Sequence, residues 1–349
     1  MFILPRFTWI IPYPIIVVPG SIPRIILSST IKLNVVFQNL KVRKSLLWSV
    51  KILVFLFVVY IFLQQLTQIS FEDFNELAIT NVWYIVIAVV LVPINWGLEL
   101  LKWYFTVKSI DRNVPWSKMV QSLLAGISTG FVTPNRLGNF IGRMLYFKGR
   151  NRAILILGTL YGNLSQFIAS LIFGVVGFIY VGSIVFDLQS EPYFPIIATL
   201  IGAIAILLFV LYPLIPIEKL KWFRKYLNVL AVFRMKAKTI VLPLLILSLV
   251  RYLVFVLQFC LLLIAFGAEY SHELIYGLYL HYLIVTFTPT LIFGKLVVRE
   301  TVGLLVLGSF IANPTIIIAA SLALWLLNLG LPALTGLFFL LKVKYAKHD

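Results

Sequence analysis

The chain has 349 residues, of which 61% are hydrophobic and 12% charged, and its mean hydropathy is +1.03. This composition excludes an ordinary soluble domain and is typical of an all-α protein that crosses a membrane several times. The net charge of +17 comes from Lys and Arg gathered in short loops between apolar runs. It therefore predicts membrane topology and attraction to an anionic inner leaflet, and not nucleic acid as a partner.

Residues 1–40 are expected to form a poorly structured or interfacial N-terminal extension, because five prolines within residues 1–38 prevent a regular spanning helix. Residues 41–345 are expected to form a single transmembrane domain. The basic residues of segment 218–238 alternate with aromatic and aliphatic residues at helical spacing. This pattern favours an amphipathic cytoplasmic segment that lies on the inner leaflet.

About six apolar runs are expected to cross the membrane fully: residues 46–66, 82–103, 153–181, 194–215, 239–266 and 314–341. The loops that join them carry Lys and Arg on one side and Asp and Glu on the other. Basic loops stay in the cytoplasm, so both termini are expected there. The expected location is a bacterial inner membrane.

Two further segments are expected to enter the membrane and return on the same side. Residues 125–152 have basic residues at both ends but contain Gly, Pro and Asn, and such backbone is tolerated at membrane depth only beside protein or a water-filled cavity. Residues 271–312 must begin and end outside if both termini are cytoplasmic. The two segments would therefore be re-entrant from opposite faces; two short spans would give residues 271–312 the same sidedness.

A short pattern recurs in these segments. Phe-Val-Thr-Pro at 131–134 precedes Gly138 and Arg143, and Phe-Thr-Pro at 287–289 precedes Gly294 and Arg299. In each, the Thr is expected to cap a half-helix whose first residue is the Pro. Opposed half-helices of this kind predict an inverted-topology repeat with a binding site at the membrane midplane. The alternative is a chance recurrence of Thr-Pro.

Ionisable side chains in or beside apolar runs mark the candidate site, because each costs about 2.5–3.5 kcal/mol at a helix centre. Six cations face two carboxylates, so the set favours a buried anion; phosphate is the simplest candidate, since Arg and helix N-termini bind it well. The full substrate-binding set comprises Glu99, Lys102, Thr133, Pro134, Asn135, Arg136, Gly138, Asn139, Arg143, Arg251, Thr288, Pro289, Lys295, Arg299 and Glu300.

Other roles remain open for some of these residues. Lys102 could extend to the membrane interface, Glu99 and Lys102 could form a structural ion pair, and Glu300 could only neutralise a nearby cation. Asn163, Gln166 and Ser170 share one helical face and are expected to make interhelical hydrogen bonds. The three histidines match no metal-ligand spacing, and no nucleotide-binding motif occurs. We expect no enzyme activity, catalytic residue, metal or cofactor.

The stretches NWGLELLKW, GISTGFVTPNRLGNFIGRMLYF and TPTLIFGKLVVRETVGLL resemble the flippase-like membrane family named for the transmembrane region of lysylphosphatidylglycerol synthase, the multiple peptide resistance factor. The likeness covers roughly residues 45–345 and is closest to the stand-alone Bacteroidetes-type members. Arg136, Gly138 and Arg143 match the family pattern. Asn139 and Lys295 stand where relatives tend to have Glu, which disfavours a lysyl-lipid and favours an anionic headgroup.

The resemblance implies lipid translocation. Together with the buried cations it predicts a flippase in which Arg136 and Arg143 hold a phosphate from the cytoplasmic side, and Arg251, Lys295 and Arg299 receive it. Alternatives are a transporter of a small anion or polyprenyl-linked precursor, and a non-transporting membrane scaffold. The expected partners are membrane phospholipids, with a homodimer left open.

Overall fold

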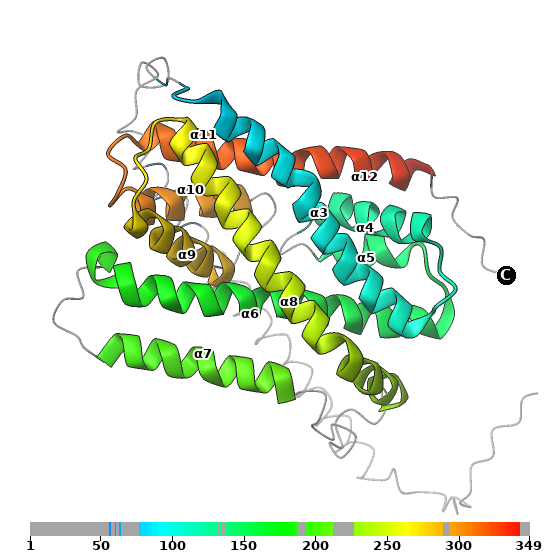
Figure 1. The fold of residues 1–349 in the computed structure, drawn as a ribbon. Coiled ribbons are helices and arrows are strands. Elements are labelled where there is room, and N and C mark those ends of the chain that lie inside the picture. The colour runs from blue at the N-terminus through cyan, green and yellow to red at the C-terminus, as the bar shows by residue number, and fades with distance from the viewer. Residues whose placement is uncertain are drawn as a thin grey trace, which may run out of the picture. The chain divides into compact units, whose positions relative to one another are not determined.

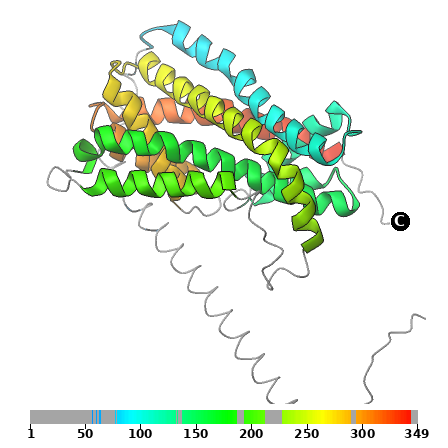
Figure 2. The same ribbon diagram turned by 60° about the horizontal axis from the view of Figure 1, so that its bottom comes forward.

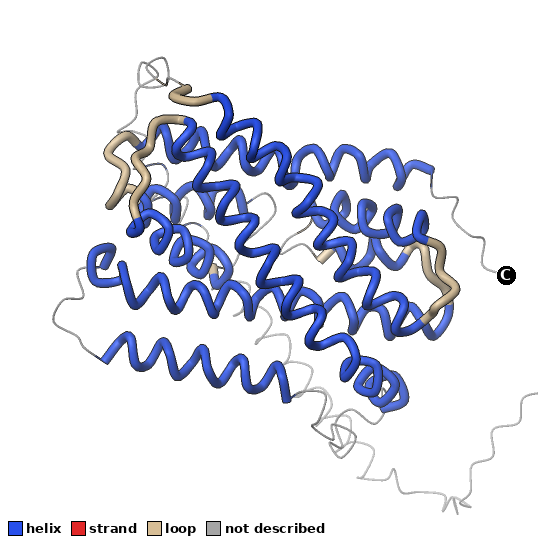
Figure 3. Tube along the Cα trace, viewed as in Figure 1, coloured by secondary structure: helices blue, strands red, loops and turns tan. Residues whose placement is uncertain are grey.

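The computed structural model describes residues 56, 60, 63, 77, 79–131, 133, 137–186, 193–211, 227–288 and 294–342. All of them belong to one compact unit, residues 51–349. The regular structure of this described part is helical throughout (Figure 3). The expected extension at 1–40, most of the expected span at 46–66, and residues 218–226 lie outside the described residues.

Figure 1 shows how the described helices are arranged. They are α3 (Val82–Ile110), α4 (Trp116–Phe131), α5 (Gly138–Met144), α6 (Gly149–Phe186), α7 (Tyr193–Leu211), α8 (Leu227–Ala265), α9 (His272–Phe287), α10 (Gly294–Leu307), α11 (Pro314–Trp325) and α12 (Leu331–Lys342). A π-helical turn, Leu326–Gly330, joins α11 to α12, so that these three elements form one continuous rod.

Among the described residues, four helical stretches are long and apolar enough to cross a membrane. They are Val82–Ile110, Asn151–Phe186, Ala237–Ala265 and Pro314–Leu341. The expected all-helical membrane architecture is therefore confirmed. Helix α7 coincides with most of the expected fourth span, while the total number of spans and the re-entrant character of the two segments stay predictions.

Each of the two expected in-and-out segments forms a helical hairpin. Helices α4 and α5 pack against each other in the first hairpin, and α9 and α10 do so in the second. In the first, a Cβ atom at Gly138 would overlap the backbone carbonyl of Thr129, and one at Gly142 would overlap that of Ala125. The arms are therefore antiparallel and in backbone contact, which only glycine permits at these two positions.

The threonines at the two breaks close the preceding helices, while the predicted helix starts at Pro134 and Pro289 lie outside the described residues. The Thr288 hydroxyl donates to the carbonyl of Ile284 at 2.8 Å, and Thr288 is the C-cap of α9. The Thr133 hydroxyl likewise donates to the carbonyl of Thr129, four residues back, at 3.0 Å. Thr133 also accepts the N–H of Gly138 at 2.7 Å and so ties α4 to the start of α5. Both hydroxyls bond the preceding turn, where helices leave carbonyls without partners.

The described helices pack as two halves, α3–α6 and α8–α12, and their relation as an inverted repeat stays a prediction. Helices α3 and α8 pack against each other and run antiparallel. Their directions follow from the hydrogen bond that the Thr80 N–H, just before α3, donates at 2.9 Å to the carbonyl of Ala265 at the end of α8. The last span of each half packs on the first hairpin arm of the other half: α6 on α9, and α12 on α4. Gly177 and Gly336 allow these two backbone approaches.

Residues 227–238 do not form a separate surface helix. They are the first turns of α8, which continues through Pro243 to Ala265 and changes direction near its start (Figure 2). Phe233 and Ala237 are buried against Ile154 and Tyr161 of α6. These two residues thus pack on protein, whereas Met235 is 64% exposed, and the cytoplasmic amphipathic character of segment 218–238 stays a prediction.

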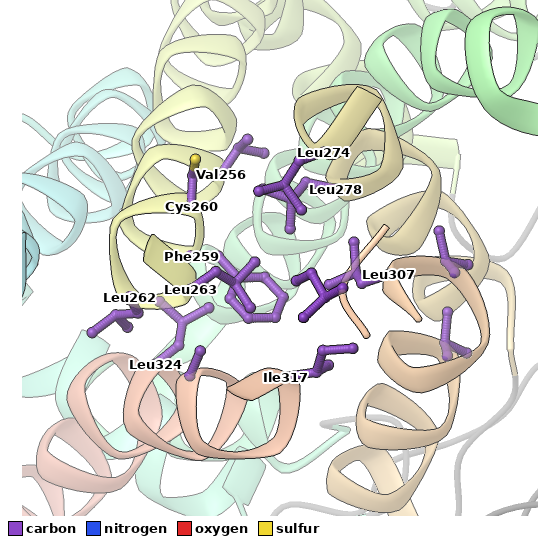
Figure 4. Packing of buried hydrophobic residues seen from close by; sticks show 14 of the residues in the cluster. Val256, Phe259, Cys260, Leu262, Leu263, Leu274, Leu278, Leu307, Ile317 and Leu324 are labelled. Atoms are coloured by element: carbon purple, nitrogen blue, oxygen red, sulfur yellow. The ribbon is translucent and has the colours of Figure 1, made fainter. Parts of the chain in front are cut away.

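The largest apolar core holds the second hairpin in place. Phe259 and Leu263 of α8, Leu278 of α9, Leu307 of α10 and Ile317 of α11 are all fully buried in it (Figure 4). Close packing of these side chains stabilises the fold through van der Waals contacts, since lipid tails are as apolar as the side chains themselves. The hairpin is therefore clamped between α8 and α11.

Candidate functional site

Glu99 gathers three cations from three helices. Its carboxylate lies 2.8 Å from Nη2 of Arg143 on α5, 3.2 Å from Nη1 of Arg251 on α8, and 3.6 Å from Nζ of Lys102 on its own helix α3. The side chains of Lys102 and Arg143 are only 5% exposed, and that of Glu99 15%. We call these four residues the Glu99 cluster. One carboxylate against three cations leaves it with a net charge of +2.

Neutral side chains hold the cations in their positions. Asn139 accepts from Nε of Arg143 at 2.9 Å, and Asn95 accepts from Nε of Arg251, also at 2.9 Å. Gln166 accepts from Lys102 and from Arg251 at 3.4 Å. The Arg143 guanidinium also lies 4.8 Å from the centre of the Trp103 ring, which favours a cation. These contacts orient the donors in advance, so a ligand would find them already ordered.

A cavity of about 650 Å³ opens beside this cluster and touches both hairpins. Gly126, Gly130, Asn139 and Arg143 line it from the first hairpin, and Val285, Thr286, Phe287 and Thr288 from the second. The remaining lining comes mainly from α3, α6 and α8 and includes Glu99, Lys102, Asn163, Gln166, Ser170 and Arg251. The cavity thus lies between the two hairpins.

Apolar side chains stand at the outer part of the same cavity. Leu160 and Leu164 of α6 are 55% and 40% exposed, and Phe287 at the end of α9 is 56% exposed. The inner wall, by contrast, carries the buried ions. A ligand with a charged end and an apolar end would match this division.

Arg299 and Glu300 do not join the Glu99 cluster. They form their own ion pair on α10, with Nη2 of Arg299 2.7 Å from Oε1 of Glu300, and Ser321 of α11 donates to that same oxygen at 2.9 Å. Neither residue lines the cavity among its described walls. Arg251, predicted to act together with Arg299, instead contacts Glu99 on α3. Position along a helix does not show which way a long side chain turns, so the grouping was wrong.

Several predicted residues remain untested. Pro134, Asn135, Arg136 and Pro289 lie outside the described residues, and of Lys295 only the helical backbone is described. Thr133 and Gly138 shape the break of the first hairpin and do not line the cavity, whereas Thr288 does.

A row of amides that was not predicted from the sequence links the two halves of the described chain. Asn95 donates to Asn328 at 2.6 Å, Asn328 donates to Gln258 at 3.1 Å, and Gln258 donates to the carbonyl of Ala88 at 2.9 Å. Asn328 lies in the π-helical turn and also lines the cavity. Such turns occur often at functional sites. A lone Asn and a lone Gln in apolar runs were the signal that could have found them.

No group of three or more His, Cys, Asp and Glu side chains able to hold a metal occurs among the described residues. A comparison with family models finds a match over residues 48–336 to the model described as "Lysylphosphatidylglycerol synthase TM region". Neither a curated protein nor a solved structure matched the chain.

Proposed function

The chain belongs to the family of the lysylphosphatidylglycerol synthase TM region, and from this premise we propose that it moves an anionic phospholipid between leaflets by binding the headgroup in the cavity beside the Glu99 cluster. In this proposal it is a multi-pass protein of a bacterial inner membrane with cytoplasmic termini. It makes or breaks no covalent bond.

One observation carries the proposal: the cavity wall has a net charge of +2 at a place where every charge is costly. Lys102, Arg143 and Arg251 share a single carboxylate, and removing charges from water costs several kcal/mol per ion. A fifth charged group, of negative sign, would offset this cost. A phosphodiester supplies that charge and accepts the paired hydrogen bonds that Arg donates.

A lipid fits the cavity better than a free anion does. The polar wall lies beside the outer apolar residues Leu160, Leu164 and Phe287, so acyl chains could leave the cavity over apolar surface. A free phosphate would have no use for that surface. The headgroup would then lie at the meeting point of the hairpins while the chains remain in lipid.

Glu99 is the residue with which the ligand competes. It accepts from Arg143 and faces Lys102 and Arg251 in the structure. A phosphate oxygen reaching these donors would replace part of that carboxylate's role without any movement of the three helices. Binding would therefore be reversible, because Glu99 takes the donors back when the lipid leaves.

The test uses the purified protein in vesicles of phosphatidylcholine and phosphatidylglycerol that carry a trace of phosphatidylglycerol labelled with a fluorophore on one acyl chain. A membrane-impermeant reductant bleaches the outer leaflet, and further bleaching reports lipid exchange. We expect exchange with the unchanged protein. Arg143→Gln and Arg251→Gln should slow it about tenfold or more, because each removes hydrogen bonds to a charged group worth about 1.5–3 kcal/mol.

The matched control is Arg112→Gln, an exposed arginine in the loop between α3 and α4, which should exchange lipid at the unchanged rate. Equal rates in all variants, or no exchange that depends on the protein, would overturn the proposal. Uptake of free phosphate without lipid exchange would favour the small-anion transporter instead. A scaffold would tolerate both cavity substitutions in every transport assay.

A further inference from the structure

A second group of buried polar side chains lies inside the second hairpin, apart from the cavity. It consists of His281 and Tyr282 on α9 and of Arg299 and Glu300 on α10. His281 is 0% exposed and Glu300 1%. Five buried polar atoms of this group have no hydrogen-bond partner among the described residues: Nδ1 and Nε2 of His281, the hydroxyl of Tyr282, Nε of Arg299 and Oε2 of Glu300.

The four side chains share one interface between the arms of the hairpin. The His281 ring lies against α10 at Gly303, where a Cβ atom would be 3.7 Å from its Cε1. Arg299 and Glu300 stand four and three residues before Gly303 and so lie one turn away on that side of α10. Phe259 of α8 packs edge-on against the imidazole, with ring centres 5.5 Å apart, and closes the group from the other side.

Unpartnered atoms at this depth are costly, at about 1–3 kcal/mol each. A bound group that gives these atoms hydrogen-bond partners would offset this cost. An anion would meet the free oxygen of Glu300, and a metal cation would meet Arg299, so neither suits the group. The atoms do include both donors and acceptors: Nε of Arg299 donates, Oε2 of Glu300 accepts, and the neutral imidazole does one of each. Water molecules and a proton satisfy this mixture.

We propose that Glu300 and His281 form a proton-binding site. In the ionised state Oε1 of Glu300 accepts from Arg299 and Ser321, and Oε2 is free to take the proton. The proton arrives from water through the imidazole, which accepts it on one nitrogen and releases another from the opposite nitrogen. Because neither imidazole nitrogen bonds Oε2 directly, a bridging water molecule must pass the proton on to Oε2. The site gains one positive charge and loses none of its covalent bonds. Buried carboxylates and histidines at membrane depth are the usual parts of proton pathways.

The cavity gives this site a route to water. Val285 and Thr286 line the cavity and stand four residues after His281 and Tyr282, on the corresponding faces of α9. The Tyr282 hydroxyl, which has no partner, can pass hydrogen bonds along that face. Protons in the cavity are therefore about one helical turn from the imidazole.

Protonation would loosen the second hairpin. Glu300 links α10 to α11 through the hydrogen bond from Ser321, and its negative charge neutralises Arg299. A protonated Glu300 has no charge and would leave Arg299 without a counter-ion. The charged groups facing Glu300 are few. Arg299 lies beside it, His281 and Tyr282 face this side of α10 from α9, and α11 contributes only Ser321 because it contains no ionisable residue. Proton occupancy would thus change how firmly the second hairpin is held. The coupling of this change to lipid movement rests on the function proposed above, whereas the proton site itself does not.

Infrared difference spectroscopy of the protein in lipid nanodiscs tests the site directly. Between about pH 9 and pH 4, where buried carboxylates titrate, we expect a carbonyl band of a protonated carboxylic acid to appear. Glu300→Gln should remove the band, and the control Glu273→Gln, an exposed carboxylate at the start of α9, should keep it. His281→Gln should shift its midpoint, whereas the exposed neighbour His272→Gln should not.

Ser321→Ala provides a milder check should Glu300→Gln fail to fold. It removes one hydrogen bond to Glu300 and should therefore shift the frequency of the band. A spectrum with no titrating band, or a band that neither Glu300→Gln nor Ser321→Ala alters, would overturn the proton site. That result would leave lipid exchange untouched. Conversely, a Glu300 band in a protein that exchanges no labelled lipid would keep the proton site and overturn the proposed function.

Discussion

The two hairpins have the same plan but different interiors. The first brings its arms together through backbone contact at Gly138 and Gly142, and its Arg143 turns out toward the cavity. The second places the ionisable side chains His281, Arg299 and Glu300 between or beside its own arms and presents little but Thr286 and Thr288 as polar groups to the cavity. The two hairpins therefore differ in chemistry: the first contributes to a cationic wall that borders the cavity, and the second holds an enclosed, nearly neutral group.

This difference follows from residue size at the contact between the arms. In the first hairpin the stem of Arg143 lies over Gly126 of the facing arm, where a Cβ atom would be 2.6 Å from its Cγ, so glycine leaves the space through which this side chain reaches the cavity. Where a histidine separates the arms, polar groups can be enclosed. The first hairpin, which faces the cavity with Arg143, and the second hairpin, which encloses His281 and Glu300, therefore differ at a few positions of the contact between their arms.

Substitution of one glycine in each hairpin should show a large difference between the two hairpins in unfolding free energy. Gly142→Ala should cost about 3 kcal/mol or more of unfolding free energy, because the new Cβ meets the backbone of Ala125, which cannot turn aside. Gly303→Ala meets only the Ile317 and His281 side chains, the nearest at 3.2 Å, and should cost less than about 1 kcal/mol. Thermal unfolding followed by circular dichroism measures both. Gly97→Ala, with nothing within 4 Å of its Cβ, is the control, and equal losses at Gly142 and Gly303 would contradict the difference between the arms.

Removal of the two buried carboxylates should distinguish the open site from the closed one. Glu99→Gln leaves three cations unpaired and should lower stability by about 3–5 kcal/mol. Glu300→Gln breaks a single pair and should lower it less. Inorganic phosphate should raise the unfolding temperature of Glu99→Gln more than that of the unchanged protein, and should raise that of Glu300→Gln only as much as that of the unchanged protein, because Glu300→Gln keeps the Glu99 cluster intact. Equal rescue of both variants would show that the second group is also open to anions.

The amide row between the halves should have an intermediate effect. Asn328→Ala leaves Nδ2 of Asn95 and Oε1 of Gln258 without partners and should cost about 1–3 kcal/mol. Because Asn95 also holds Arg251, the same variant should slow exchange of labelled phosphatidylglycerol. Asn113→Ala, in the exposed loop after α3, should change neither quantity. A stability loss with unchanged lipid exchange would mean that Asn328 does not position Arg251.

The threonines at the breaks should show the smallest effect. Thr133→Val removes a hydroxyl that both donates to Thr129 and accepts from Gly138, so it should cost about 1–2 kcal/mol. Thr288→Val removes one donated bond to Ile284 and should cost about half as much. Chemical denaturation in detergent can rank the two. A larger loss at Thr288 would mean that the second break depends on its threonine more than the first.

Much of the site was predictable from local pattern. Glu99 and Lys102 do share a face and do pair, Arg143 does reach the cavity, and both hairpins occur at the expected segments. Spacing along one helix determines such neighbours, because the helix geometry is constant. The bonds of Thr133 and Thr288 to the preceding helices were not predicted, because Thr can bond the turn before it as readily as the turn after it.

The sequence by itself determined that this is a helical membrane protein with two interrupted segments and an excess of buried cations, since hydropathy, breaks and charge are properties of short stretches. Only the tertiary structure decided that Arg251 pairs with Glu99, that Arg299 pairs with Glu300, and that Asn328 joins the halves. These contacts join residues whose distance depends on how α3, α5, α8 and the final rod cross. Packing of whole helices sets those crossings, and no local pattern along one helix encodes the direction in which a long side chain turns once they meet.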